Sequence, residues 1–395
     1  MRGVRRLLAS GALFVMAACA EGSEAPSAPP ASGSSASGLP TASPEARFAE
    51  AAEAVGAIGW SSGLERQVAG LLVGRPGDPA ALEALLVEAR PALDGLDAAT
   101  RGPWSLAASG DERPTRDEWE AAVWLAYGDA TLAAAAGERE RAWARSLLAD
   151  RVAARLAGAE GASFSELIIA FGLAEAGALH VQRMTALRPP SAAEAASATG
   201  LRPIAQEAWD AALRTEAQAA TARIAAMADD PARAAGPFGE APASPVPPTL
   251  DVEATQDAAV GLFLAAASRT LEDCPAPLDL APPVQVGNTA GQALLSDLAA
   301  ALARLDDRRC LTEAARRAAV IALRLRAGAA PGDPLPPRLP EDAPLDPMTI
   351  APFGYDPARA VLWSAGADRR LEAGPGQGPF DDREPTWFLD LRPLL

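Results

Sequence analysis

The chain has 395 residues, of which 49 % are hydrophobic and 22 % are charged, so it can bury a core and is long enough for two or three domains. Its formal net charge is −16, and every basic residue is an arginine. The acidic balance argues against a nucleic-acid partner. The lack of lysine excludes Schiff-base chemistry, a Ser-Lys dyad and a P-loop.

The first residues have the pattern of an export signal. Three arginines precede an apolar run that ends at Ala18, and this run is shorter than the roughly 20 residues of a membrane span. The run ends in Met-Ala-Ala directly before Cys19, which resembles the lipobox of bacterial lipoproteins. The resemblance implies that the signal peptide, 1–18, is removed and that the Cys19 thiol is diacylated. An ordinary signal peptide that contains a cysteine is the alternative.

The lipid on Cys19 is the expected membrane contact. Removal of residues 1–18 takes away three arginines and no acid, which brings the net charge to −19. Such a surface gains no attraction from anionic headgroups. Residues 19–42 are rich in Ser, Ala, Pro and Gly, and we expect them to be a flexible tether. The protein is therefore expected in the bacterial cell envelope, facing the periplasm or the surface, and Ala20 favours the outer membrane by resemblance to sorted lipoproteins.

Residues 43–235 are predicted to be an α-helical domain. Apolar residues recur there at helical spacing behind capping boxes and N1 prolines, and no strand pattern occurs between 43 and 230. The expected helices cover 43–56, 62–72, 79–93 with a kink or break at Pro91, 115–132, 139–156, 163–187 and 203–228. The helix over 163–187 is nearly apolar enough to span a membrane. Because Glu166, Glu175 and His180 interrupt it, we interpret it as a buried core helix.

The remainder begins with a Pro/Gly-rich linker over 236–248. The last region, 249–395, is expected to hold helices around 251–273, 289–305 and 311–327. Two short apolar segments, 360–363 and 386–389, then predict strands of a small hairpin or sheet. The predicted fold class is mainly α: a helical array or bundle followed by a small C-terminal α+β module with short strands.

The other two cysteines are predicted to form a disulfide. With Cys19 lipidated, Cys274 and Cys310 remain as an even pair in an oxidising compartment. The bond would close a loop of about 36 residues and stabilise the fold by about 3–4 kcal/mol. Two buried free thiols are the alternative.

The C-terminal tail carries two short motifs, DPMT at 346–349 and LWSAGAD at 362–368, with Tyr355 between them. Together they resemble the C-terminal segment of type II secretion major pseudopilins over about 345–390. The resemblance implies a Ca²⁺ site in the loop that follows, with Asp368 as the matching acid and Asp381 and Asp382 as less closely matched ligands. The chain departs from the family by having Arg369 and Arg370 where a Gly-rich turn is expected. A solvated acidic loop without metal is the alternative.

No catalytic motif stands in the context that its chemistry requires. Gly59 to Gly63 matches G-x-S-x-G, but a helix precedes it and Ser62 has a capping role. His180 is the single histidine, so we expect a core residue and not a zinc ligand of the usual His/Cys kind. Four tryptophans predict either core filling or an aromatic-lined ligand cleft; they are Trp104, Trp119, Trp124 and Trp143.

These patterns favour a lipid-anchored envelope protein that acts as a non-catalytic scaffold or protein-interaction module, with another envelope protein as its partner. A solute-binding lipoprotein with a Trp-lined cleft is the first alternative. A carboxylate-based hydrolase is a less favoured one, because pairs of Asp and Glu are abundant in the chain.

Overall fold

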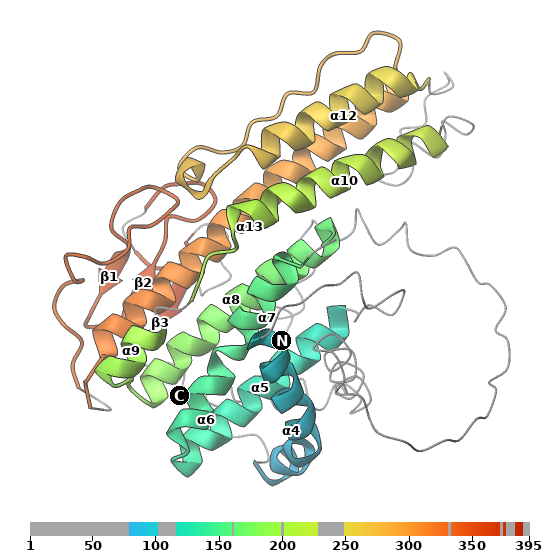
Figure 1. Cartoon of the computed structure of the whole chain (residues 1–395). Helices are drawn as coiled ribbons and strands as arrows, with labels where there is room; N and C mark the ends of the chain where they lie inside the picture. Colours follow the sequence, from blue (N-terminus) through green and yellow to red (C-terminus); the bar gives the residue numbers. More distant parts are fainter. Residues whose placement is uncertain are drawn as a thin grey trace, which may run out of the picture. The chain divides into compact units, whose positions relative to one another are not determined.

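The computed structural model describes residues 79–101, 116–159, 162–198, 201–227, 249–330, 333–371, 374–376 and 384–389. Within these ranges the protein is mainly helical with a small antiparallel sheet near the C-terminus, as the sequence predicts (Figure 1). The helices are α4 Pro79–Arg101, α5 Arg116–Ala136, α6 Arg139–Ser146, α7 Leu148–Ala157, α8 Phe164–Leu187, α9 Ala192–Ala198, α10 Gln206–Ala226, α12 Val252–Ala267, η3 Leu271–Asp273 and α13 Thr289–Arg326. The signal peptide, the tether with Cys19 and the 236–248 linker lie outside the described residues.

Several helices differ in extent from the expectation. Helix α4 is continuous through Pro91, with Leu86 and Leu93 buried on either side of it. The segment expected as one helix over 139–156 is two, α6 and α7, which are separated at Leu147. Helix α13 joins the two helices expected at 289–305 and 311–327. The sequence between them is charged but contains neither Gly nor Pro, so nothing in it ends a helix.

Helix α8 is a core helix that begins at the predicted capping box. The Ser163 hydroxyl accepts a hydrogen bond from the Glu166 backbone N–H, and the Glu166 carboxylate accepts one from the Ser163 N–H at 2.6 Å. Among the described helices, α8 has the length and composition of a membrane span. However, 56 % of its most apolar window is buried inside the protein. Gly177 lets α7 approach closely, because a Cβ there would lie 3.1 Å from the Asp150 backbone nitrogen.

The described residues form two compact units. The small unit comprises 216–227, 249–265 and 279–305, and the large unit comprises all the others. Helices α10, α12 and α13 each contribute residues to both units. Each unit contains residues from before and from after the expected linker, so the units do not follow the predicted domain boundary. The linker itself lies outside the described ranges.

The C-terminal sheet belongs to the large unit. Its strands are β1 Gly354–Asp356, β2 Val361–Trp363 and β3 Thr386–Phe388, paired antiparallel in the order β1-β2-β3. Leu362 lies opposite Tyr355 on one side and Trp387 on the other. Leu362 and Trp387 are buried in one cluster with alanines of α13. The two strands predicted at 360–363 and 386–389 are confirmed; β1 is an addition.

Candidate functional site

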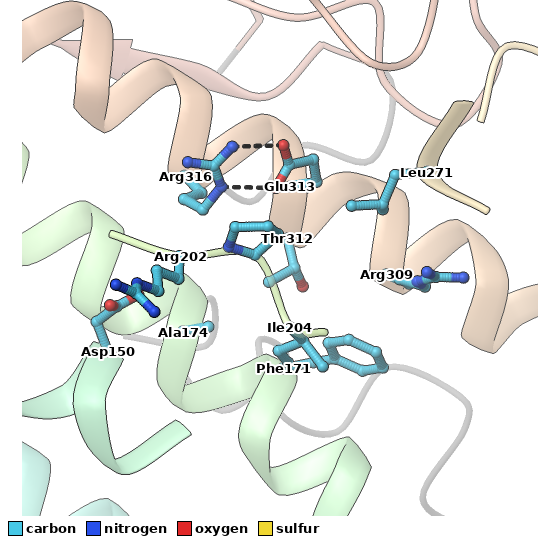
Figure 2. A pocket seen from close by; sticks show the side chains of 11 residues that line it. Asp150, Phe171, Ala174, Arg202, Ile204, Leu271, Arg309, Thr312, Glu313 and Arg316 are labelled. Carbon is cyan, nitrogen blue, oxygen red and sulfur yellow. Dashed lines mark hydrogen bonds and ion pairs between the residues drawn. The ribbon is translucent and has the colours of Figure 1, made fainter. Parts of the chain in front are cut away.

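A narrow cavity in the large unit brings charged side chains together (Figure 2). One wall is a single face of α13, because its four lining residues are spaced i, i+3, i+4 and i+7; they are Arg309, Thr312, Glu313 and Arg316. Phe171 and Ala174 of α8 and Asp150 of α7 line the other side. The non-helical segment 202–204 and Leu271 of η3 complete the lining, with Arg202 beside Asp150 (Figure 2).

The arginines of this cavity are bonded to the protein itself. Arg316 pairs with Glu313 at 2.6 Å and donates to the Leu201 carbonyl at 2.9 Å. The Arg309 guanidinium lies 4.6 Å from the centre of the Trp209 ring and donates to the Arg269 carbonyl at 2.9 Å. Burial lowers the pKa of Arg309 to about 10, so it remains charged at neutral pH. These charges hold α13 to its neighbours.

Asp150 is the acid of the cavity with the strongest change in acidity. It is 7 % exposed, and burial raises the pKa of its carboxyl to about 7. The positive charge of Arg316 and a hydrogen bond from the Arg202 backbone N–H oppose this rise. A carboxyl that titrates near neutral pH has the acidity of a general acid or base.

The size of the cavity limits what that carboxyl can act on. Its volume is about 20 Å³, which is room for one water molecule. Pockets for small-molecule ligands measure roughly 300–1,000 Å³. The Asp150 cavity can therefore hold a water molecule, but it lacks the space for a sugar or a peptide.

The tryptophans are not among the residues that line this cavity. Trp119 and Trp143 are buried, and Trp124 is half-buried with its ring packed edge-on against Tyr127. Trp104 lies outside the described residues. His180 is buried with its ring centre 3.7 Å from that of Tyr127, and burial with the nearby charge of Arg183 holds the pKa of His180 well below its usual value. These positions are those of core side chains.

The predicted disulfide between Cys274 and Cys310 is present. Both cysteines are buried, and they share a cluster with Met348 and Ala365 of the C-terminal module. The bond therefore lies where α13 meets the segment after α12 and the tail.

The two motifs of the tail meet at Asp346. Its buried carboxylate accepts hydrogen bonds from the Met348 N–H at 3.0 Å, the Ser364 hydroxyl at 2.9 Å and the Ala365 N–H at 2.8 Å. The Tyr355 hydroxyl donates to the Pro336 carbonyl at 2.7 Å. Asp346 thus fastens the start of the module to the end of β2.

The acids predicted to bind Ca²⁺ are described only in part. Asp368 is exposed and accepts a hydrogen bond from the Arg370 N–H at 3.0 Å. Asp381 and Asp382 lie outside the described residues. Within those residues, no three His, Cys, Asp or Glu side chains gather as a metal site would require. The Ca²⁺ site stays a prediction.

Sequence reasoning missed an exposed loop of the small unit, 284–288. Val284 and Val286 are 85 % and 98 % exposed, whereas the intervening Gln285 faces the helices and bonds to them. Asn288, the single asparagine of the chain, is 3 % exposed and bonds to α12. The alternation of apolar and polar residues in Val284, Gln285 and Val286 was the sequence signal at this position.

The chain matches no protein-family model, no curated protein and no solved structure. The function is therefore inferred from the geometry and from the sequence.

Proposed function

We propose that this is a lipid-anchored protein of the bacterial cell envelope, outer membrane favoured over inner, that binds another protein through its small unit. The observation that carries the proposal is the exposure of Val284 and Val286 on a loop that is fixed in place. Single exposed apolar side chains are ordinary in proteins. Val284 and Val286 are two positions apart on one ordered loop, so together they offer more apolar surface for protein contact than a single side chain.

Hydrogen bonds to both neighbouring helices hold the loop. The Gln285 side chain donates to the Ala254 carbonyl at 2.7 Å, and its backbone N–H donates to Gln292 Oε1 at 3.0 Å. Asn288 Nδ2 donates to Thr255 Oγ1 at 2.8 Å. A loop that is already ordered loses less conformational entropy on binding, so it favours affinity.

The charge around the loop indicates the chemistry of the partner. The described residues of the small unit, 216–227, 249–265 and 279–305, carry six acids and two arginines. The acids are Glu216, Asp251, Glu253, Asp257, Asp279 and Asp297, and the arginines are Arg223 and Arg304. Such a surface attracts a positively charged one and repels a second acidic chain. We expect the partner to present apolar side chains within a basic segment.

The test is capture of the partner by cross-linking the full-length protein in its own membrane. The double variant Val284→Ser, Val286→Ser removes the apolar side chains without adding a charge that a basic partner would attract, and it should lose the captured protein. The control is Val87→Ser on α4, because Val87 is also exposed, at 56 %, but lies in the large unit. This control should capture the same partner as the unmodified protein.

Salt provides a second measurement. Binding of the captured partner should weaken as ionic strength rises, because exposed charges are screened over about 8 Å at physiological salt. Equal capture by the double variant and the control would exclude the loop as the site. Capture of nothing by the unmodified chain would overturn the proposal itself.

A further inference from the structure

The loop after β2 is held by an arginine whose side chain is mostly shielded from solvent. The Arg369 side chain is 10 % exposed, and its guanidinium donates three hydrogen bonds. Nε donates to the Cys274 carbonyl at 2.9 Å, Nη1 to the Ala367 carbonyl at 2.6 Å and Nη2 to Asp307 Oδ1 at 2.6 Å. One side chain thereby joins the disulfide segment, the loop and helix α13.

The backbone at Arg369 is in an unusual conformation. Its φ is 59°, in the left-handed region that side chains other than glycine rarely adopt. A residue keeps such a conformation when its surroundings stabilise it. The three hydrogen bonds of the guanidinium provide that stabilisation.

The oxygen set around this guanidinium is of the kind that binds a hard cation. Two backbone carbonyls and a carboxylate are typical Ca²⁺ ligands. Here the positive charge already comes from the chain, and it would repel a metal ion brought to the same oxygens. Asp368, the acid expected to bind Ca²⁺, instead accepts the Arg370 N–H and is exposed. The described residues of this loop therefore do not fit a calcium ion.

We infer that Arg369 supplies the cation of this loop, in place of the Ca²⁺ that the tail's resemblance implies. The guanidinium bonds the loop to Cys274 and Asp307. The loop therefore keeps its place in the C-terminal module without a metal ion. This inference concerns the large unit alone and does not depend on the proposed partner.

Thermal unfolding of the full-length protein in mild detergent tests the inference. The melting temperature should be the same in excess chelator and in millimolar Ca²⁺. Arg369→Gln should lower the melting temperature by about 5 °C, because the charge-assisted hydrogen bonds that Arg369 donates to three segments are lost. Arg370→Gln removes the same charge from the neighbouring exposed side chain and should change it little.

Asp307→Asn is a second variant, chosen because it keeps an acceptor oxygen while removing the charge. If Arg369 acts through Asp307, the double variant Arg369→Gln, Asp307→Asn should be less destabilised than the two single effects combined. Hydrogen exchange should rise over 364–371 in Arg369→Gln and not in Arg370→Gln. A melting temperature of the unmodified protein that rises with Ca²⁺ would overturn the inference. So would equal effects of the two arginine variants.

Discussion

Buried ionisable side chains set much of the chemistry of this protein. The Asp129 carboxylate is fully buried and accepts hydrogen bonds from Arg90 at 3.1 Å and from Arg145 at 3.0 Å, and it also pairs with Arg141. Burial alone would raise the pKa of Asp129, but the three arginines outweigh it and hold the pKa below its usual value. Asp150 has no comparable set of arginine partners in the described part of the chain, so burial raises its pKa.

This difference makes Asp150 a source of pH dependence. Its folded-state pKa of about 7 lies above the ordinary value of 3.8. The proton that it holds therefore stabilises the folded state in full below pH 3.8, and this contribution is lost as the pH rises to about 7. Asp150→Asn removes the carboxyl that must ionise while keeping an acceptor for the Arg202 N–H.

We expect Asp150→Asn to raise the free energy of unfolding at pH 8 by up to about 4 kcal/mol and to have little effect at pH 4. Urea unfolding at the two pH values measures the difference. Glu341→Gln removes an exposed carboxyl and serves as the control. A variant that is less stable than the unmodified protein at pH 8 would contradict the assigned acidity.

For single residues, the sequence predicts the disulfide partner of a cysteine better than it predicts whether a charged side chain is buried. Cys274 and Cys310 could be paired because they are the even remainder once Cys19 is set aside. Glu313 and Arg316 could be placed on a helix, but their spacing is also that of a solvated face, and Arg309 fell between the two predicted helices. Burial of a charge depends on which helix covers it, and the sequence of one helix does not contain that information.

Among the helices and strands, α13 is an element whose length the sequence did not predict. The sequence predicts its two halves as separate helices, 289–305 and 311–327, with the charged stretch 306–309 between them. In the structure those charges are used in packing: Asp306 pairs with Arg269 at 3.0 Å and Arg308 pairs with Glu175. The capping box at Ser163 and strands β2 and β3 were predictable because their signals are local. Strand β1 was not, since its three residues form a strand only by pairing with β2.

The contribution of the disulfide to the free energy of unfolding can be measured. Cys274→Ser, Cys310→Ser should lower the free energy of unfolding by about 3–4 kcal/mol, because the unfolded chain regains the freedom of the 36-residue loop. Denaturant unfolding with and without reductant measures this. Reductant should destabilise the unmodified protein and leave the double variant unchanged. An effect of reductant on the double variant would show that the loss has another origin.

For the whole molecule, the proposed attachment to the membrane rests on one residue. Cys19→Ala removes the thiol that would carry lipid, and residues 19–395, with a net charge of −19, have little electrostatic attraction to anionic membranes. We expect this variant to move from the membrane fraction to the soluble fraction with an unchanged melting temperature. Fractionation followed by immunoblotting measures it. Retention of Cys19→Ala in the membrane fraction would show that another part of the chain binds the membrane.

The bond between Cys274 and Cys310 also has a topological consequence. It makes residues 274–310 a covalent ring that contains the Val284–Asn288 loop and the first half of α13. A protease that cuts once inside this ring opens it without separating the chain into two pieces. The exposed loop can therefore be nicked while the C-terminal module stays covalently joined to the part of the chain before Cys274. Such a cut becomes visible only when the disulfide is reduced.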